Sequence, residues 1–157
     1  MRLANVDLSN NILTQLAYGA SYSAASVVAA VAAANSQAQL YNTAIPPTIT
    51  AVLSLWVSIG TAGDVTLGFY NTALTTDDGA GNANLAGLDT SYTHARHATN
   101  AGLQGTMLKR VSLPAGQSVN IVQPFEFGLI NNRGLIVQAV TVNIPIVVSW
   151  SFAEIQG

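Results

Sequence analysis

The chain contains no cysteine and very little charge. Without cysteine in its 157 residues, neither disulfide bonds nor thiolate chemistry is available, and the redox compartment cannot be inferred. Only 8% of the residues are charged and the formal net charge is −2, whereas about 25% of residues are charged in an ordinary globular domain. Half of the residues are hydrophobic, which argues against intrinsic disorder. The length suits one domain with a substantial core.

The scarcity of charge has two interpretations. In the first, neutral Ser, Thr, Asn and Gln side chains cover the surface of an isolated protein. In the second, neighbouring subunits cover much of that surface. We favour the second interpretation, because the buried centres of protein interfaces are depleted of charged residues.

The sequence disfavours nucleic-acid binding, a membrane span and a signal peptide. The five basic residues are scattered and form no patch able to neutralise a run of phosphates, so we expect no nucleic-acid partner. The most apolar stretch, residues 17–34, is mostly alanine interrupted by glycine and serines, so we expect no membrane span. The start of the chain lacks the basic region followed by an apolar run that marks a signal peptide.

Short apolar runs separated by turn residues predict an all-β protein. The final run alternates: Ile146, Val148, Trp150 and Phe152 fall on one side of a strand, which is typical of a half-buried position. The run from Thr48 to Ile59 alternates as well, and places Trp56 on its polar face. The pattern predicts eight or nine strands, over residues 24–33, 37–42, 49–59, 65–70, 108–113, 118–122, 125–130, 134–142 and 144–155.

This pattern predicts an antiparallel β-sandwich of the jelly-roll or Greek-key type. We expect an extended N-terminal arm over residues 1–23 and a sandwich domain over residues 24–157. For residues 24–33, alanine favours helix and the β-branched valines favour strand, and we choose strand. Residues 71–106 show no alternation, and we expect a long loop insertion there.

Candidate interface residues are an aromatic pair, a histidine pair and two leucines of the arm. Trp56 would be an interface anchor or merely an exposed aromatic. Tyr92, His94 and His97 lie in the expected loop, where a neighbour could contact them. The arm either lies on another surface or is a frayed terminus. In the first case its apolar contacts would come from Leu13 and Leu16.

Catalytic and metal-binding motifs have little support. His94 and His97 would meet on one helical turn and bind a metal with Asp77, Asp78 or Asp89, but no further ligand has diagnostic spacing. The run from Asp77 to Asn82 lacks the alternating ligands of a calcium loop. No nucleophile motif, phosphate-binding loop or carboxylate pair is evident. We therefore expect no enzyme activity, no cofactor and no metal.

The chain resembles the capsid decoration, or cement, proteins of tailed phages, which have jelly-roll folds. The resemblance lies in Leu-Pro-Ala-Gly-Gln at 113–117, Phe-Gly-Leu at 127–129, Gly-Leu-Ile-Val at 134–137 and Ile-Val-Val-Ser-Trp-Ser-Phe at 146–152. The early Gln-Leu-Tyr-Asn at 39–42 and Gly-Thr-Ala-Gly-Asp-Val at 60–65 agree with it. It covers residues 26–157 apart from the central insertion.

The resemblance implies a structural virion protein without catalytic residues. Such a protein would be made in the cytoplasm of a bacterial host and would then sit on the outer capsid surface. It would form a homo-oligomer, typically a trimer, that bridges subunits of the major capsid protein. Two alternatives stay open: a tail, neck or fibre component, and a carbohydrate-binding β-sandwich that uses Trp56, Tyr70 or Tyr92 as a stacking platform.

Overall fold

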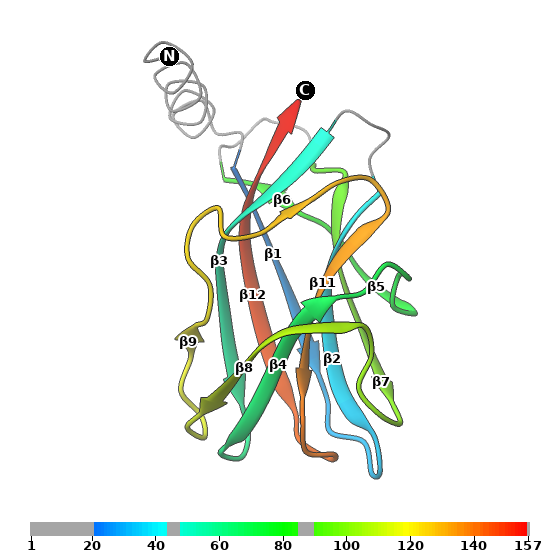
Figure 1. Ribbon diagram of the computed structural model, residues 1–157, viewed down its shortest axis with the longest axis vertical. Coiled ribbons are helices and arrows are strands. Elements are labelled where there is room, and N and C mark those ends of the chain that lie inside the picture. The colour runs from blue at the N-terminus through cyan, green and yellow to red at the C-terminus, as the bar shows by residue number, and fades with distance from the viewer. Residues whose placement is uncertain (1–20, 44–47, 85–89, 157) are drawn as a thin grey trace.

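The computed structural model describes residues 21–43, 48–84 and 90–156, and all regular structure within them is β (Figure 1). The expected arm lies mostly outside these residues, as do Leu13 and Leu16. The sandwich itself begins at Ser21. The strands are β1 (Ser21–Val28), β2 (Asn35–Asn42), β3 (Thr48–Ile59), β4 (Gly63–Phe69), β5 (Thr76–Ala80), β6 (Asn82–Ala83), β7 (Thr93–Asn100), β8 (Thr106–Leu113), β9 (Val119–Asn120), β10 (Gly128–Leu129), β11 (Arg133–Ala139) and β12 (Ile146–Gln156).

The strands form two antiparallel sheets packed face to face. The first sheet has the order β10-β3-β12-β1-β6, and β9 also pairs with β3. The second sheet has the order β5-β7-β2-β11-β4-β8. The expected β-sandwich is confirmed, and β1 is a strand rather than a helix.

The winding of the chain is that of a jelly roll. Strands β1 to β4 alternate between the two sheets, and β8 pairs with β4. β9 and β10 then both lie in the first sheet, β11 lies in the second, and β12 lies in the first. Thus β1, β12, β3 and the short β9 and β10 face β2, β11, β4 and β8. This is the arrangement that two interlocked Greek keys produce.

The expected long loop at residues 71–106 is wrong, because β5, β6 and β7 lie within it. β7 pairs with β2 along its whole length, from Asn35↔Asn100 to Asn42↔Thr93. This strand is difficult to predict from the sequence because its inward positions are filled by small residues. Examples are Thr93 and Ala95, which are 0% and 1% exposed. Polar side chains occupy much of the rest, so no hydrophobic alternation marks the strand.

The core lies between the sheets and is built from aliphatic side chains around Trp150 and Phe152. The alternation predicted for the final strand is confirmed. Ile146, Val148, Trp150 and Phe152 are each at most 1% exposed, whereas Val147 and Ser149 face outward. A one-residue slip of β12 would expose both aromatic rings, so the core fixes its register.

The alternation expected along β3 holds only in its second half. Leu55, Val57 and Ile59 are buried as expected, but Ile49 is 40% exposed and Thr50 is fully buried. The reason is a bulge: Ser151 pairs with Ser54 and Phe152 with Val52, so the residue between them is unpaired. One extra residue reverses the inward and outward positions beyond it.

β2 is buried on both faces although most of its residues are polar. Its outward side chains are covered by the segments at 70–74 and 100–104, to which they are hydrogen bonded. Gln39 donates through Nε2 to the carbonyl oxygens of Tyr70 (2.8 Å) and Thr72 (3.1 Å), and accepts from the Leu74 N–H (2.9 Å). Gln37 donates to Gln138 Oε1 (2.8 Å). These bonds satisfy buried polar groups that would otherwise be costly.

Candidate functional site

The outer face of the first sheet presents an uncharged set of side chains from three neighbouring strands. Register places β1, β12 and β3 residues side by side in three rows, all directed away from the core. The rows are Ser23–Ser151–Ser54, Ala25–Ser149–Trp56 and Val27–Val147–Ser58. All nine side chains are exposed or half-buried. We call these nine residues the serine–tryptophan face.

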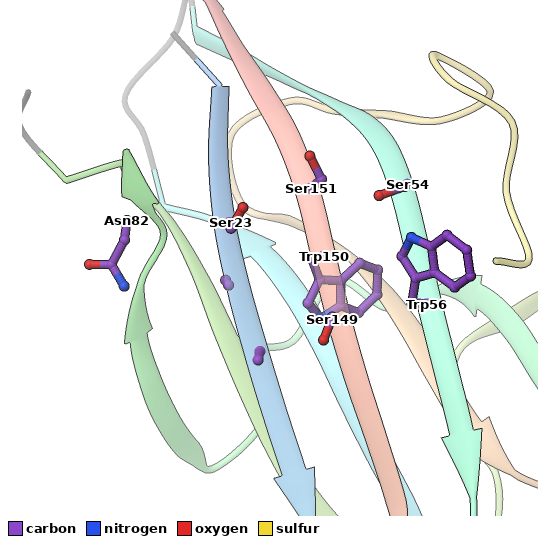
Figure 2. A pocket seen from close by; sticks show the side chains of 9 residues that line it. Ser23, Ser54, Trp56, Asn82, Ser149, Trp150 and Ser151 are labelled. Atoms are coloured by element: carbon purple, nitrogen blue, oxygen red, sulfur yellow. The ribbon is translucent and has the colours of Figure 1, made fainter. Parts of the chain in front are cut away.

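Part of this face is hollowed into a groove of about 450 Å³. Figure 2 shows Trp56 on β3 and Asn82 on β6 at opposite sides of the groove, with the serines between them. Trp56 is 45% exposed. The groove is lined by Ser23, Ala24, Ala25, Ser54, Trp56, Asn82, Ser149, Trp150 and Ser151, none of which is charged.

Three hydroxyl groups of the groove are available to a ligand. Within residues 21–43, 48–84 and 90–156, the side chains of Ser54, Ser149 and Ser151 make no hydrogen bond to the protein, whereas Ser23 Oγ donates to Asn84 Oδ1 (2.8 Å). The Trp56 strand is held on both sides, by β12 and by β9, where Trp56 pairs with Asn120. The groove is therefore built on a rigid sheet.

The two histidines expected to share a site are separated. Both lie on β7, and residues three apart in a strand point to opposite faces. His94 Nδ1 lies 3.0 Å from an oxygen of Asp77, and Arg96 contacts the same carboxylate at 2.8 Å. His97 Nδ1 lies 2.7 Å from Asp78. The shared metal site considered from the sequence does not form from this pair.

The contact between His97 and Asp78 helps to link the two sheets. Asp78 accepts a hydrogen bond of 2.5 Å from Ser26 Oγ on β1, while its carboxylate also contacts His97 on β7. Asp77, on the other face, is an ion-pair centre. Partial burial raises the pKa of Asp77, but hydrogen bonds from His94 and the Gly79 N–H, with the charge of Arg96, outweigh burial and leave the pKa below its ordinary value.

Glu154, on β12, is half-buried. Burial raises the pKa of Glu154, although the Thr93 N–H and hydroxyl, each donating at 2.9 Å, oppose that effect. Thr93 Oγ1 also lies 2.5 Å from Thr50 Oγ1, which ties the two sheets together. No second carboxylate is paired with Glu154 among the described residues.

Most remaining charges neutralise one another. Lys109 Nζ lies 2.8 Å from Glu126, and Arg110 Nε lies 2.7 Å from Asp64. With Asp77, which Arg96 contacts, three of the five described acids pair with arginine or lysine; Asp78 contacts His97, and Glu154 accepts hydrogen bonds from Thr93. Among the described cations, only Arg133 makes no ion pair. The exterior therefore presents little unpaired charge.

The predicted site residues occupy different parts of the molecule. Trp56 faces outward on the first sheet, and Tyr92 is 59% exposed just before β7 in the second. The groove serines were not singled out from the sequence, although Ser149 and Ser151 fall on the polar side of the alternation that predicts β12. In the part of the chain that the structure describes, no three His, Asp or Glu side chains are grouped to hold a metal ion.

Comparison with known proteins gives no relative. No family model, no curated protein and no solved structure matches this chain. Over the described ranges, no helix has the length and hydrophobicity needed to cross a membrane.

Proposed function

We propose that this chain is a non-enzymatic structural protein that decorates the outer surface of a tailed-phage capsid. In this proposal it forms a homo-oligomer, a trimer, and bridges subunits of the major capsid protein. The observation that carries the proposal is the exterior: internally paired charge combined with exposed large apolar side chains. Such a surface is stabilised when other subunits cover it.

The surface best suited to such contacts lies along β8, one of the two edge strands of the second sheet. Met107 is 62% exposed and Leu108 is 41% exposed on this strand. The neighbouring segment, tied to β8 by the Lys109–Glu126 ion pair, adds exposed Phe125. Lys109, Arg110 and the bulge at Leu108 oppose strand pairing along this edge, so the contact that we propose is made by the exposed apolar side chains, which binding would cover.

Oligomerisation would make weak contacts with a capsid effective. Several copies of one modest contact, held together in one oligomer, raise the overall affinity by about 10²–10⁴ over that of a single contact. A lattice of repeated capsid subunits offers the matching set of sites. The jelly-roll body would then act as a rigid spacer between the contacts.

The proposal is tested by co-sedimentation with capsid shells that lack this protein, prepared from the phage that encodes it. Wild-type protein should sediment with the shells, and a Met107→Glu/Leu108→Glu double variant should stay in the supernatant. Val31→Glu is the matched control, because Val31 is also exposed (44%) but lies in the loop after β1. Absence of wild-type binding would refute the proposal. Electron microscopy that places the protein on the tail would assign it to the tail instead.

A further inference from the structure

We propose that the groove on the serine–tryptophan face binds a neutral saccharide segment. The groove is separate from the β8 edge, so this inference does not depend on capsid binding. A saccharide offers two kinds of surface: hydroxyl groups around its rim and an apolar C–H face. The groove offers a partner for each.

The first partner is the indole ring of Trp56. A tryptophan that is 45% exposed on a sheet face presents a large, flat, rigid surface. Trp56 stands at one side of the groove, and the Asn82 amide stands at the other (Figure 2). One sugar ring would lay its C–H face against the indole, and a following ring of the same segment would reach across β12 and β1 toward the Asn82 amide, three strand spacings or roughly 14 Å away.

The second partner is the floor of hydroxyl groups. Ser54, Ser149 and Ser151 lie on two adjacent strands, with Ser151 paired to Ser54 and Ser149 paired to Trp56. A hydroxyl group both donates and accepts hydrogen bonds, which matches the hydroxyl groups of a sugar. Because these strands are hydrogen bonded on both sides, little conformational entropy is lost when a ligand binds.

Charge and size exclude other occupants. No groove residue is charged, so nucleic acids, phosphorylated ligands and acidic glycans find no cation to neutralise them. The nine positions of the face span roughly 10 Å by 14 Å from ordinary strand and residue spacings. Each side of a stable protein interface covers about 800 Å², which is several times larger. A second copy of the chain or a globular protein would therefore need additional surface, whereas a short saccharide would not.

Titration with neutral oligosaccharides tests this inference. Malto-, cello-, chito- and galacto-oligosaccharides are titrated into ¹⁵N-labelled full-length protein, with heparin and sialylated oligosaccharides as acidic comparisons. At least one neutral series should bind and shift the amide signals of the three outer strands. Trp56→Ala should weaken that binding at least about tenfold, because the buried indole area is lost. A Ser149→Ala/Ser151→Ala variant should weaken it while leaving the fold intact.

Tyr92→Ala is the matched control, because Tyr92 is an exposed aromatic residue outside the groove. The Tyr92→Ala variant should bind the neutral oligosaccharide with the same affinity as the wild type. Binding by no neutral series, equal binding by Trp56→Ala, or preferred binding of acidic glycans would each overturn the inference. Dissociation of an oligomer by Trp56→Ala would show that a second copy occupies the groove, which also overturns it. Co-sedimentation of Trp56→Ala with capsid shells distinguishes this site from the capsid-binding surface.

Discussion

Replacing Gln39 by leucine tests how the segment at 70–74 is held against the second sheet. Gln39 is fully buried and makes three hydrogen bonds to that segment, to Tyr70 O, Thr72 O and Leu74 N. Leucine has a similar size but neither donates nor accepts. The variant therefore removes the three bonds without opening a large cavity.

The expected loss of unfolding free energy follows from the surroundings of the three groups to which Gln39 is hydrogen bonded. The Leu74 N–H is left unsatisfied in a buried position, which costs about 1–3 kcal/mol, and each carbonyl bond contributes about 1 kcal/mol. The added apolar surface of leucine offsets about 1 kcal/mol. The free energy of unfolding should fall by about 2–4 kcal/mol, which corresponds to a Tm lower by roughly 5–15 °C for a domain of this size.

Urea unfolding monitored by circular dichroism measures this change. Gln123→Leu is the control, because Gln123 is exposed and its side chain makes no hydrogen bond to the described residues. Its free energy of unfolding should change by less than about 0.5 kcal/mol. A loss below about 1 kcal/mol for Gln39→Leu would show that these hydrogen bonds do not hold the segment, and the reasoning would be wrong.

Two further predictions concern the sheets. Because burial raises the pKa of Glu154 above its ordinary value of 4.5, the folded state keeps the proton to a higher pH than the unfolded state, and stability falls as pH rises through that interval. Glu154→Gln, which keeps an acceptor for Thr93, should flatten this fall in urea titrations between pH 4 and pH 7; an unchanged slope would assign it to another group. Gly81→Ala should lower the free energy of unfolding by about 1–3 kcal/mol, since its Cβ would collide with the Phe152 ring and Ser91 Oγ. Gly63→Ala, where the added Cβ meets only ordinary contact, should change it by less than about 1 kcal/mol, and equal losses in both variants would contradict the packing argument.

Much of the sandwich could be predicted from the sequence, because hydrophobic alternation reports directly which residues a sheet buries. β12 and the second half of β3 follow this rule. The first half of β3 does not, because the unpaired residue at the bulge reverses its faces. A bulge depends on pairing with a strand that is distant in the sequence, so its position cannot be predicted from the local sequence.

The second sheet was harder to predict. β2 is buried through hydrogen bonding of its glutamine and asparagine side chains, which look like surface residues in the sequence. β7 combines small buried residues, such as Thr93 and Ala95, with polar ones, so it shows no hydrophobic alternation. The sequence left open that His94 and His97 meet on one helical turn, whereas the strand geometry of β7 places them on opposite faces.

The candidate site was only partly visible in the sequence. The alternation along residues 48–59 marks Trp56 as a candidate, because it places a large aromatic residue on a polar face. The serines of β12 carried no signal of their own, because single serines are common on exposed strand faces. Only the register between β1, β12 and β3 brings them beside Trp56.

The central claim is that the charge-poor exterior is covered by other subunits. Sedimentation equilibrium of the purified full-length chain tests it most directly. The subunit mass is 16.2 kDa, so the account predicts a trimer of 3 × 16.2, about 49 kDa. A single species of 16.2 kDa at micromolar concentration would contradict it.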